Sequence, residues 1–211
     1  MTQILVFGTS TEWGAWDAQG GWVDRLKQHC NQLHLKAPEQ YYVVYNLGVS
    51  GDTSRELSVR IREEFRARKD PAEKNIILIS IGGNDAAYFP KKNKCLVPLE
   101  EYKLNLTKIL TTAQRIADKV YCLDLEPVDD ERMNPCSWRK EICYQDSIVR
   151  EYNTALLETC ARMKVKIIPS YEAWRKENWK LLLHDRLHPN SKGHELTFNT
   201  VRKFLEGEKI L

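Results

Sequence analysis

Short apolar runs alternate with amphipathic segments along the whole chain, and this alternation restricts the fold more than any other feature. Each run is rich in β-branched residues and short enough to form a strand buried on both faces. The runs lie at residues 3–8, 41–48, 75–83, 119–125 and 165–170. Alternation of this kind requires parallel strands joined by right-handed crossovers. The sequence therefore predicts an α/β fold, a three-layer α/β/α sandwich around a five-stranded parallel sheet.

The segments between these runs have the residue spacing of amphipathic helices. One face of the first carries Trp22, Leu26, Cys30 and Leu33, and one face of the second carries Leu57, Ile61 and Phe65. The second also has a start signal, because Thr53 and Glu56 are spaced as a capping box. Further helices are predicted over residues 99–117, 141–163 and 190–206.

Length and charge limit the classes of protein to consider. A chain of 211 residues fits one domain, which we expect to span residues 1–211. Its 32 basic and 29 acidic side chains are dispersed, so we expect no nucleic-acid partner. No run reaches the roughly 18 apolar residues of a membrane span, and the first predicted strand begins too early for a secretory leader. These features predict a cytoplasmic protein without a membrane partner, and they give no signal of the oligomeric state.

The cysteines lie at positions 30, 95, 122, 136, 143 and 160 and include no Cys-x-x-Cys pair. They are too sparse for a disulfide scaffold, and we expect most of them to be reduced and buried. Cys136 and Cys143 flank a short segment that a disulfide could close, although the reduced form is favoured.

Polar residues gather after the first three predicted strands and before the last predicted helix. These clusters are residues 8–10, 46–53, 82–85 and 185–189. In an open parallel sheet, ligands bind beyond the carboxyl ends of the strands, where we expect these clusters to meet. Two long connections, residues 89–98 and 126–140, leave the sheet at the same edge and are predicted to wall the site.

The clusters contain the groups that acyl transfer needs. A serine hydroxyl becomes nucleophilic when an imidazole accepts its proton, and an acid on the other ring nitrogen orients that imidazole. Ser10, His188 and Asp185 fit these roles. The developing oxyanion requires fixed donors. The N–H of Ser10, the N–H of Gly51 and the Asn84 amide are predicted to supply them.

In this order, the clusters resemble the blocks of the SGNH hydrolases, also called GDSL esterases and lipases. Ser10 matches the nucleophile of block I, Gly51 in VSGDTS the glycine of block II, and Asn84 in GGND the asparagine of block III. Asp185 and His188 in DRLHP match the block V pair. The resemblance implies a flavodoxin-like sheet order and neither a metal nor an organic cofactor. Block I usually reads Gly-Asp-Ser in this family, whereas Thr9 stands here in place of the Asp.

Several other residues have a functional and a structural interpretation. Trp13, Trp16 and Trp138 could line the crevice or pack loops onto the core. Lys91, Lys92 and Lys94 could attract an anionic substrate, although a charge run is usually a solvated loop. His184 and His188 have the spacing of a helical zinc pair, but the following proline argues against a helix through both, so no metal is expected.

These inferences together predict a serine ester hydrolase that forms an acyl-enzyme on small acyl esters, with a deacetylase of a carbohydrate or small alcohol favoured. A lysophospholipase or thioesterase is the alternative within the same chemistry. A non-catalytic ligand-binding module that retains the fold is the alternative outside it. A phosphate or nucleotide binder is disfavoured, because residues 8–14 contain no Lys and lack the G-x-G-x-x-G spacing.

Overall fold

The computed structural model describes residues 1–133 and 135–211, apart from the side chain of Arg132. Its main sheet has five parallel strands in the order β2-β1-β3-β6-β7. Their bounds are Thr2–Gly8 for β1, Tyr42–Gly48 for β2, Lys74–Ile79 for β3, Lys119–Leu123 for β6 and Lys166–Ile168 for β7. Among these strands alone the order is 2-1-3-4-5, which is the flavodoxin-like order. Both the predicted fold class and the sheet order implied by the family resemblance are confirmed.

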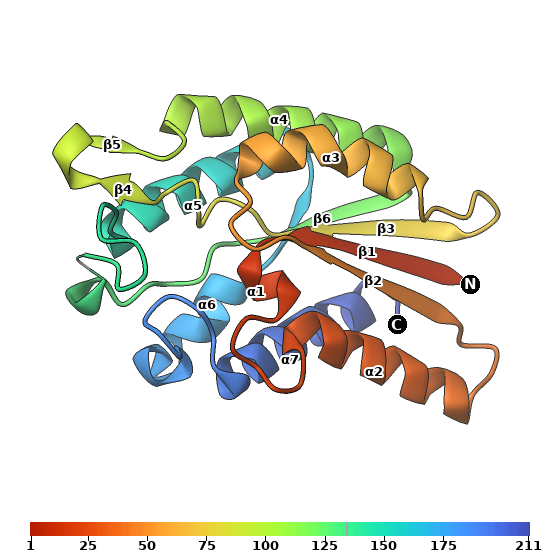
Figure 1. The fold of residues 1–211 in the computed structure, drawn as a ribbon. Helices are drawn as coiled ribbons and strands as arrows, with labels where there is room; N and C mark the ends of the chain where they lie inside the picture. The colour runs from red at the N-terminus through yellow and green to blue at the C-terminus, as the bar shows by residue number, and fades with distance from the viewer. Residues whose placement is uncertain (134) are drawn as a thin grey trace.

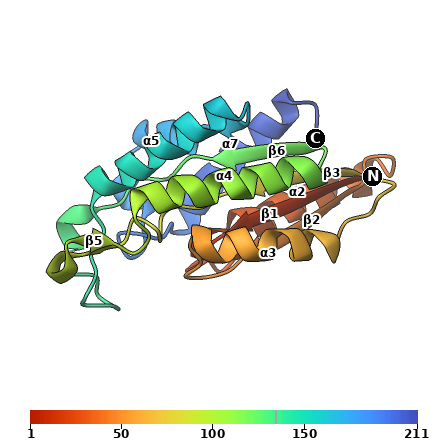
Figure 2. The same cartoon turned by 90° about the horizontal axis from the view of Figure 1, so that it is seen from above.

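Helices cover both faces of this sheet (Figures 1 and 2). The helices on one face are α3 (Ser54–Arg66), α4 (Leu99–Ile116) and α5 (Asp146–Arg162). The helices on the other face are α2 (Gly21–Lys36) and α7 (Ser191–Gly207), with the short α6 (Ser170–Arg175) packed on α7. The remaining short elements are α1 (Ser10–Trp13), the hairpin of β4 (Tyr88–Phe89) and β5 (Lys94–Cys95), and the 3-10 turns η1 (Pro90–Lys92), η2 (Asp130–Arg132) and η3 (Trp179–Leu182).

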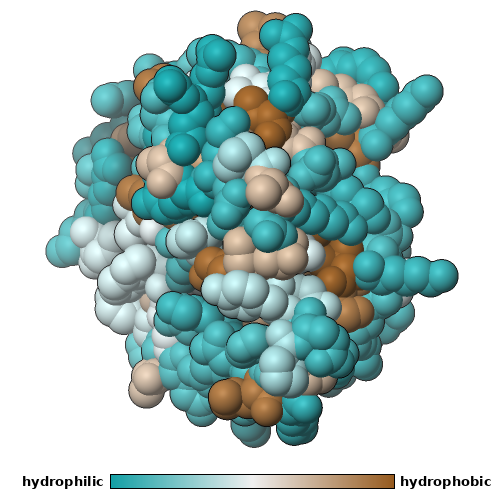
Figure 3. Space-filling model, turned by 90° about the vertical axis from the view of Figure 1, so that its right-hand side faces the viewer, coloured by the Kyte–Doolittle hydropathy of each residue, from teal (hydrophilic) through white to brown (hydrophobic). Residues whose placement is uncertain are grey.

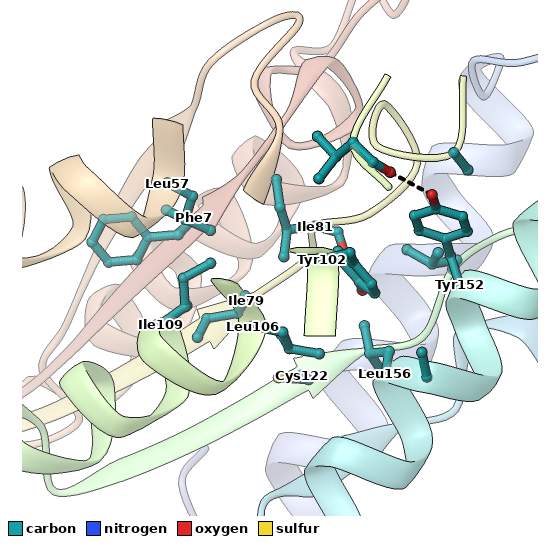
Figure 4. Packing of buried hydrophobic residues seen from close by; sticks show 14 of the residues in the cluster. Phe7, Leu57, Ile79, Ile81, Tyr102, Leu106, Ile109, Cys122, Tyr152 and Leu156 are labelled. Carbon is teal, nitrogen blue, oxygen red and sulfur yellow. Dashed lines mark hydrogen bonds between the residues drawn. The ribbon is translucent and has the colours of Figure 1, made fainter. Parts of the chain in front are cut away.

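The alternation of side chains along β1 produces one hydrophobic core on each side of the sheet. Leu5 and Phe7 pack toward α3, α4 and α5, whereas Ile4 and Val6 pack toward α2 and α7. Figure 4 shows the first of these cores. Within it, the rings of Tyr102 and Tyr152 lie 5.1 Å apart. Tyr102 Oη donates a hydrogen bond to the carbonyl of Ile81 at 3.0 Å, so both the ring and the hydroxyl of this side chain are satisfied in the core.

The edge strand β2 departs from the predicted burial on both faces. Val44 and Leu47 are its buried residues, and its other side chains are half-buried. An edge strand has a neighbouring strand on one side only, so the helices of the two outer layers cover it less completely than they cover β1.

Most predicted helix boundaries agree with the structure, and the capping box of Thr53 and Glu56 is confirmed. The helix predicted from residue 141 instead begins at Asp146. The reason is that Cys143 pairs with Tyr88 through reciprocal backbone hydrogen bonds of 2.9 Å, which hold the preceding residues extended. Cys136 and Cys143 are both buried free thiols, as are most of the other cysteines, so the disulfide alternative for this pair is wrong.

Figure 3 shows the face toward which the two chain ends lie. Hydrophilic residues cover most of it, and hydrophobic ones appear in small separate groups. Among the helices of the described residues, we find none with the length and apolar character needed to cross a membrane.

Candidate active site

Ser10 lies at the carboxyl end of β1, where it begins the single-turn helix α1. Thr9 precedes this turn, and its backbone N–H donates to Glu12 Oε2 at 2.8 Å. This capping contact stabilises the first turn of α1, although Thr9 stands where the family usually has Asp. Gly48, at the end of β2, has to be glycine, because a Cβ at this position would lie 2.3 Å from the backbone nitrogen of Trp13. Close packing of the end of β2 against α1 therefore helps to place the serine.

Asp185 and His188 lie on the loop between η3 and α7, whose ends are joined by a bridge between Leu183 and Pro189. Asp185 Oδ1 accepts hydrogen bonds from the backbone N–H groups of Leu187, at 3.1 Å, and His188, at 2.8 Å. The loop therefore folds back on the carboxylate, which explains how residues three positions apart can pair through their side chains.

The three predicted side chains form a continuous chain of contacts. Ser10 Oγ lies 2.9 Å from His188 Nε2, and His188 Nδ1 lies 2.8 Å from Asp185 Oδ2. An ionised carboxylate can only accept, so Nδ1 carries the proton and Nε2 is free to accept the one on Ser10. Burial alone would raise the pKa of Asp185, but hydrogen bonds from the His188 ring and backbone outweigh it and lower this pKa to about 2. Asp185 is therefore ionised at neutral pH.

Gly51 and Asn84 reach the same place from the ends of β2 and β3. Gly51 is the third residue of a turn closed by a hydrogen bond of 3.1 Å from Asp52 N–H to the Val49 carbonyl. Its φ of +88° lies in the left-handed region that favours glycine. Gly51 and Asn84 both line one pocket with Ser10 and His188. The structure thus brings together all five residues predicted for the site.

Two hollows meet at the serine. The outer pocket, of about 350 Å³, is lined by all three tryptophans predicted near the crevice, Trp13, Trp16 and Trp138. Their exposed fractions are 57%, 57% and 49%, so they do not pack a loop onto the core. The inner pocket, of about 70 Å³, is lined in part by the buried residues Ile81 and Leu123. Both pockets are lined by Ser10, Asn84, Tyr144, Leu187 and His188.

The inner pocket has two kinds of wall. The lining includes the apolar side chains of Leu125, Val128 and Val149 and the polar side chains of Ser80, Asp124 and Glu126. Burial raises the pKa of Glu126 to about 8, against the lowering effect of its hydrogen bond from Thr197. The polar part of the lining therefore contains a carboxyl group that is protonated at neutral pH.

Some predicted parts of the site lie elsewhere. Residues 126–140 do wall it, through Glu126, Val128 and Trp138, although Asn134 in this connection lies outside the described residues. Residues 89–98 instead form the β4–β5 hairpin and are absent from the described linings of both pockets, so the role predicted for this connection is wrong. Lys91, Lys92 and Lys94 belong to this exposed hairpin.

His184 lies outside any helix, and its backbone N–H donates to the carbonyl of His188 at 2.8 Å. Within residues 1–133 and 135–211, no group of three or more His, Cys, Asp or Glu side chains could hold a metal ion.

Sequence reasoning missed two contacts of the site. The indole Nε1 of Trp16 lies 2.9 Å from Asp185 Oδ2, and the Tyr144 hydroxyl donates to Asn84 Oδ1 at 3.3 Å. The sequence indicated Trp16 only as a residue that could line the crevice. Tyr144 belongs to none of the polar clusters or motifs that marked the other site residues.

The flavodoxin-like sheet and the contacts of Ser10, His188 and Asp185 have the geometry of a serine hydrolase. The chain belongs to the GDSL-like Lipase/Acylhydrolase family, whose model matches residues 6–196. It is therefore an enzyme of the esterase class.

Several individual proteins are also similar to this chain. The isoamyl acetate-hydrolyzing esterase 1 homolog of Mus musculus is 25% identical, with 97% of this chain and 81% of that protein covered. The Homo sapiens homolog is 23% identical with the same coverage. Among solved structures, the acetylxylan esterase Axe2 from Geobacillus stearothermophilus superposes with a TM-score of 0.71 at 20% identity, over 97% of this chain and 92% of that one. The last comparison shows a shared fold.

Proposed function

We propose that the protein hydrolyses short-chain carboxylic esters through an acyl-enzyme on Ser10. The observation that carries this proposal is the unbroken contact of 2.9 Å and 2.8 Å from Ser10 Oγ through the His188 ring to Asp185. In this arrangement His188 can accept the proton of the Ser10 hydroxyl, and the Asp185 carboxylate holds the His188 ring from its other nitrogen.

In the acylation step, Ser10 Oγ attacks the ester carbonyl carbon while His188 Nε2 accepts the hydroxyl proton. The carbonyl oxygen becomes an oxyanion, to which the N–H of Ser10, the N–H of Gly51 and Asn84 Nδ2 donate. The carbon–oxygen bond to the alcohol then breaks, and the imidazolium gives its proton to the departing oxygen. The products of this step are the free alcohol and an ester of Ser10.

Deacylation repeats these steps with water as the nucleophile. His188 accepts a proton from water as the water oxygen attacks the acyl carbon, and the same donors hold the second oxyanion. The bond to Ser10 Oγ breaks, the proton returns to Oγ, and the carboxylic acid leaves. Asp185 stabilises the imidazolium in both steps and stays ionised, in agreement with its low pKa.

The inner pocket supports a short acyl group. Its apolar lining residues Leu125, Val128 and Val149 suit a methyl or ethyl group of an acyl part bound at Ser10. A pocket of about 70 Å³ leaves little room for a longer alkyl chain, and the polar lining residues Asp124 and Glu126 would offer such a chain little apolar surface. An acetyl group is therefore our preferred acyl part, and the acetate esters named for the similar esterases agree with it.

The outer pocket supports the alcohol part of the ester. Exposed aromatic rings provide flat surfaces for a sugar ring or for a small apolar alcohol. The Trp138 and His188 ring centroids lie 5.7 Å apart. An alcohol part bound against Trp138 would therefore lie next to His188, which donates the proton to the departing oxygen. We propose an acetylated carbohydrate or small alcohol as the substrate class.

A panel of p-nitrophenyl esters, from acetate to octanoate, together with acetylated xylose, tests this proposal. We expect kcat/KM to be highest for acetate and to fall with chain length. The Ser10→Ala variant should fold normally and lose at least about a thousandfold in kcat/KM. Equal hydrolysis by Ser10→Ala and the unaltered protein would rule out the acyl-enzyme mechanism, and a maximum at octanoate would rule out the short acyl group.

A further inference from the structure

Trp16 contacts the acid and the base of the proposed triad at the same time. Its indole Nε1 lies 2.9 Å from Asp185 Oδ2 and 3.2 Å from His188 Nδ1. Since His188 Nδ1 carries a proton, the indole N–H donates to Asp185. Oδ2 thus accepts from two side chains, while Oδ1 accepts from two backbone N–H groups. Both oxygens of the Asp185 carboxylate therefore have hydrogen-bond partners.

The backbone of Trp16 is held in an uncommon conformation for this contact. Its φ of +63° lies in the left-handed region, which costs free energy for a residue with a side chain. The neighbouring residues fix it from both sides. Ala15 N–H donates to the Ser10 carbonyl at 2.9 Å, and the Ala15 carbonyl lies 3.1 Å from His194 Nε2. On the other side, Asp17 forms an ion pair with Arg25.

Hydrophobic burial does not explain this arrangement, because Trp16 is 57% exposed. Its ring stands edge-on to the His188 ring, with centroids 6.0 Å apart. Trp16 provides a hydrogen-bond donor to Asp185 from the segment that follows Ser10. Trp16 thereby links the segment that follows Ser10 to the loop of Asp185, which lies 169 positions after Trp16 in the sequence.

From these contacts we infer that Trp16 is a positioning residue, whose indole N–H fixes the Asp185 carboxylate and, through it, the His188 ring facing Ser10. This inference rests on the proposed function. It adds a fourth side chain to the triad, one that does not exchange a proton.

The contact also has an electrostatic consequence. An N–H dipole that points its positive end at Oδ2 and Nδ1 disfavours a positive charge on the ring. Ionisable groups around His188 include Asp185 on its own loop, His184 next to Trp16 and His194 on α7. Tyr144 lines both pockets with His188, and Asp124 and Glu126 line the inner pocket with it. Burial lowers the pKa of His194, so this side chain is neutral where the triad works. Removal of the indole N–H should therefore favour the imidazolium.

The test is the Trp16→Phe variant, which keeps an aromatic ring on the same backbone and removes the N–H. With p-nitrophenyl acetate, we expect kcat to fall roughly tenfold, as for the loss of a hydrogen bond to a charged group. We expect the acid limb of the kcat/KM profile to move to higher pH. Trp13→Phe is the matched control, because Trp13 lines the same pocket with the same exposed fraction.

The Trp13→Phe change is expected to alter KM and to leave the acid limb in place. A residue that only walls the pocket would behave in this way at position 16 too. An unmoved acid limb in Trp16→Phe, or an equal movement in Trp13→Phe, would overturn the positioning role. Ser10→Ala is assayed beside them. If that variant is inactive and Trp16→Phe behaves like Trp13→Phe, this inference fails and the proposed function stands.

Discussion

The Tyr144 hydroxyl contacts the side-chain amide of Asn84 at the candidate oxyanion site. The Tyr144 hydroxyl donates to Asn84 Oδ1 at 3.3 Å, and Asn84 Nδ2 donates to the Asp52 carbonyl at 2.8 Å. An amide nitrogen has two protons, so one remains for a ligand in the pocket. The flipped amide, which would present an acceptor to the oxyanion, is excluded because its oxygen would then face the Asp52 carbonyl, which cannot donate.

Asn84→Ala should lower kcat by about a hundredfold to a thousandfold, as expected for the loss of one oxyanion donor. Tyr144→Phe keeps the ring and removes the orienting hydroxyl, so we expect a loss of about threefold, in line with one neutral hydrogen bond. Steady-state kinetics on p-nitrophenyl acetate measures both. A larger loss in Tyr144→Phe than in Asn84→Ala would show that the amide is not the group that matters.

The strands and the proposed triad could be predicted because their signals are local. A run of β-branched residues indicates a buried strand by itself, and the polar residues that follow it have to lie at the carboxyl edge of a parallel sheet. The order of the strands is different. Right-handed crossovers permit several orders, and the family resemblance rather than the apolar pattern selected the observed one.

The contacts of Trp16 and Tyr144 could not be predicted in this way. Trp16 meets Asp185 across 169 positions, and Tyr144 meets Asn84 across 60. Such pairs depend on how two loops pack, and no periodicity in the chain reports it. The start of α5 was misplaced for a related reason, because the pairing of Cys143 with Tyr88 is also non-local.

Gly51→Ala should disturb the site through the backbone alone. A Cβ at this position would meet no atom within 4 Å, so the change creates no steric clash. The φ of +88° is nevertheless costly for alanine, by about 1 kcal/mol. If the turn relaxes to avoid this cost, its N–H moves away from the oxyanion, and we expect kcat/KM to fall roughly tenfold.

The control for this change is Gly207→Ala at the last residue of α7, where a Cβ also meets no atom within 4 Å. Chemical denaturation and ester hydrolysis are measured on both variants. Equal activity in Gly51→Ala and Gly207→Ala would remove the Gly51 N–H from the proposed oxyanion site.

Glu126 should make the free energy of unfolding depend on pH. Burial raises its pKa to about 8 in the folded protein, whereas the unfolded chain has an ordinary carboxyl pKa. Between these two pKa values the unfolded state is ionised and the folded state is not, so folding takes up a proton. The contribution of this group to stability is therefore complete below the unfolded pKa and is lost as pH rises to about 8.

Glu126→Gln removes this titration and keeps an acceptor for Thr197 Oγ1, which donates to Glu126 Oε1 at 2.6 Å. Relative to the unaltered protein, the variant should gain on the order of 4 kcal/mol in unfolding free energy between about pH 5 and about pH 9. Urea denaturation at both pH values measures this gain. Glu195→Gln, an exposed position on α7, controls for the loss of a carboxylate. A gain of the same size in Glu195→Gln would show that net charge, and not the burial of Glu126, sets the pH dependence.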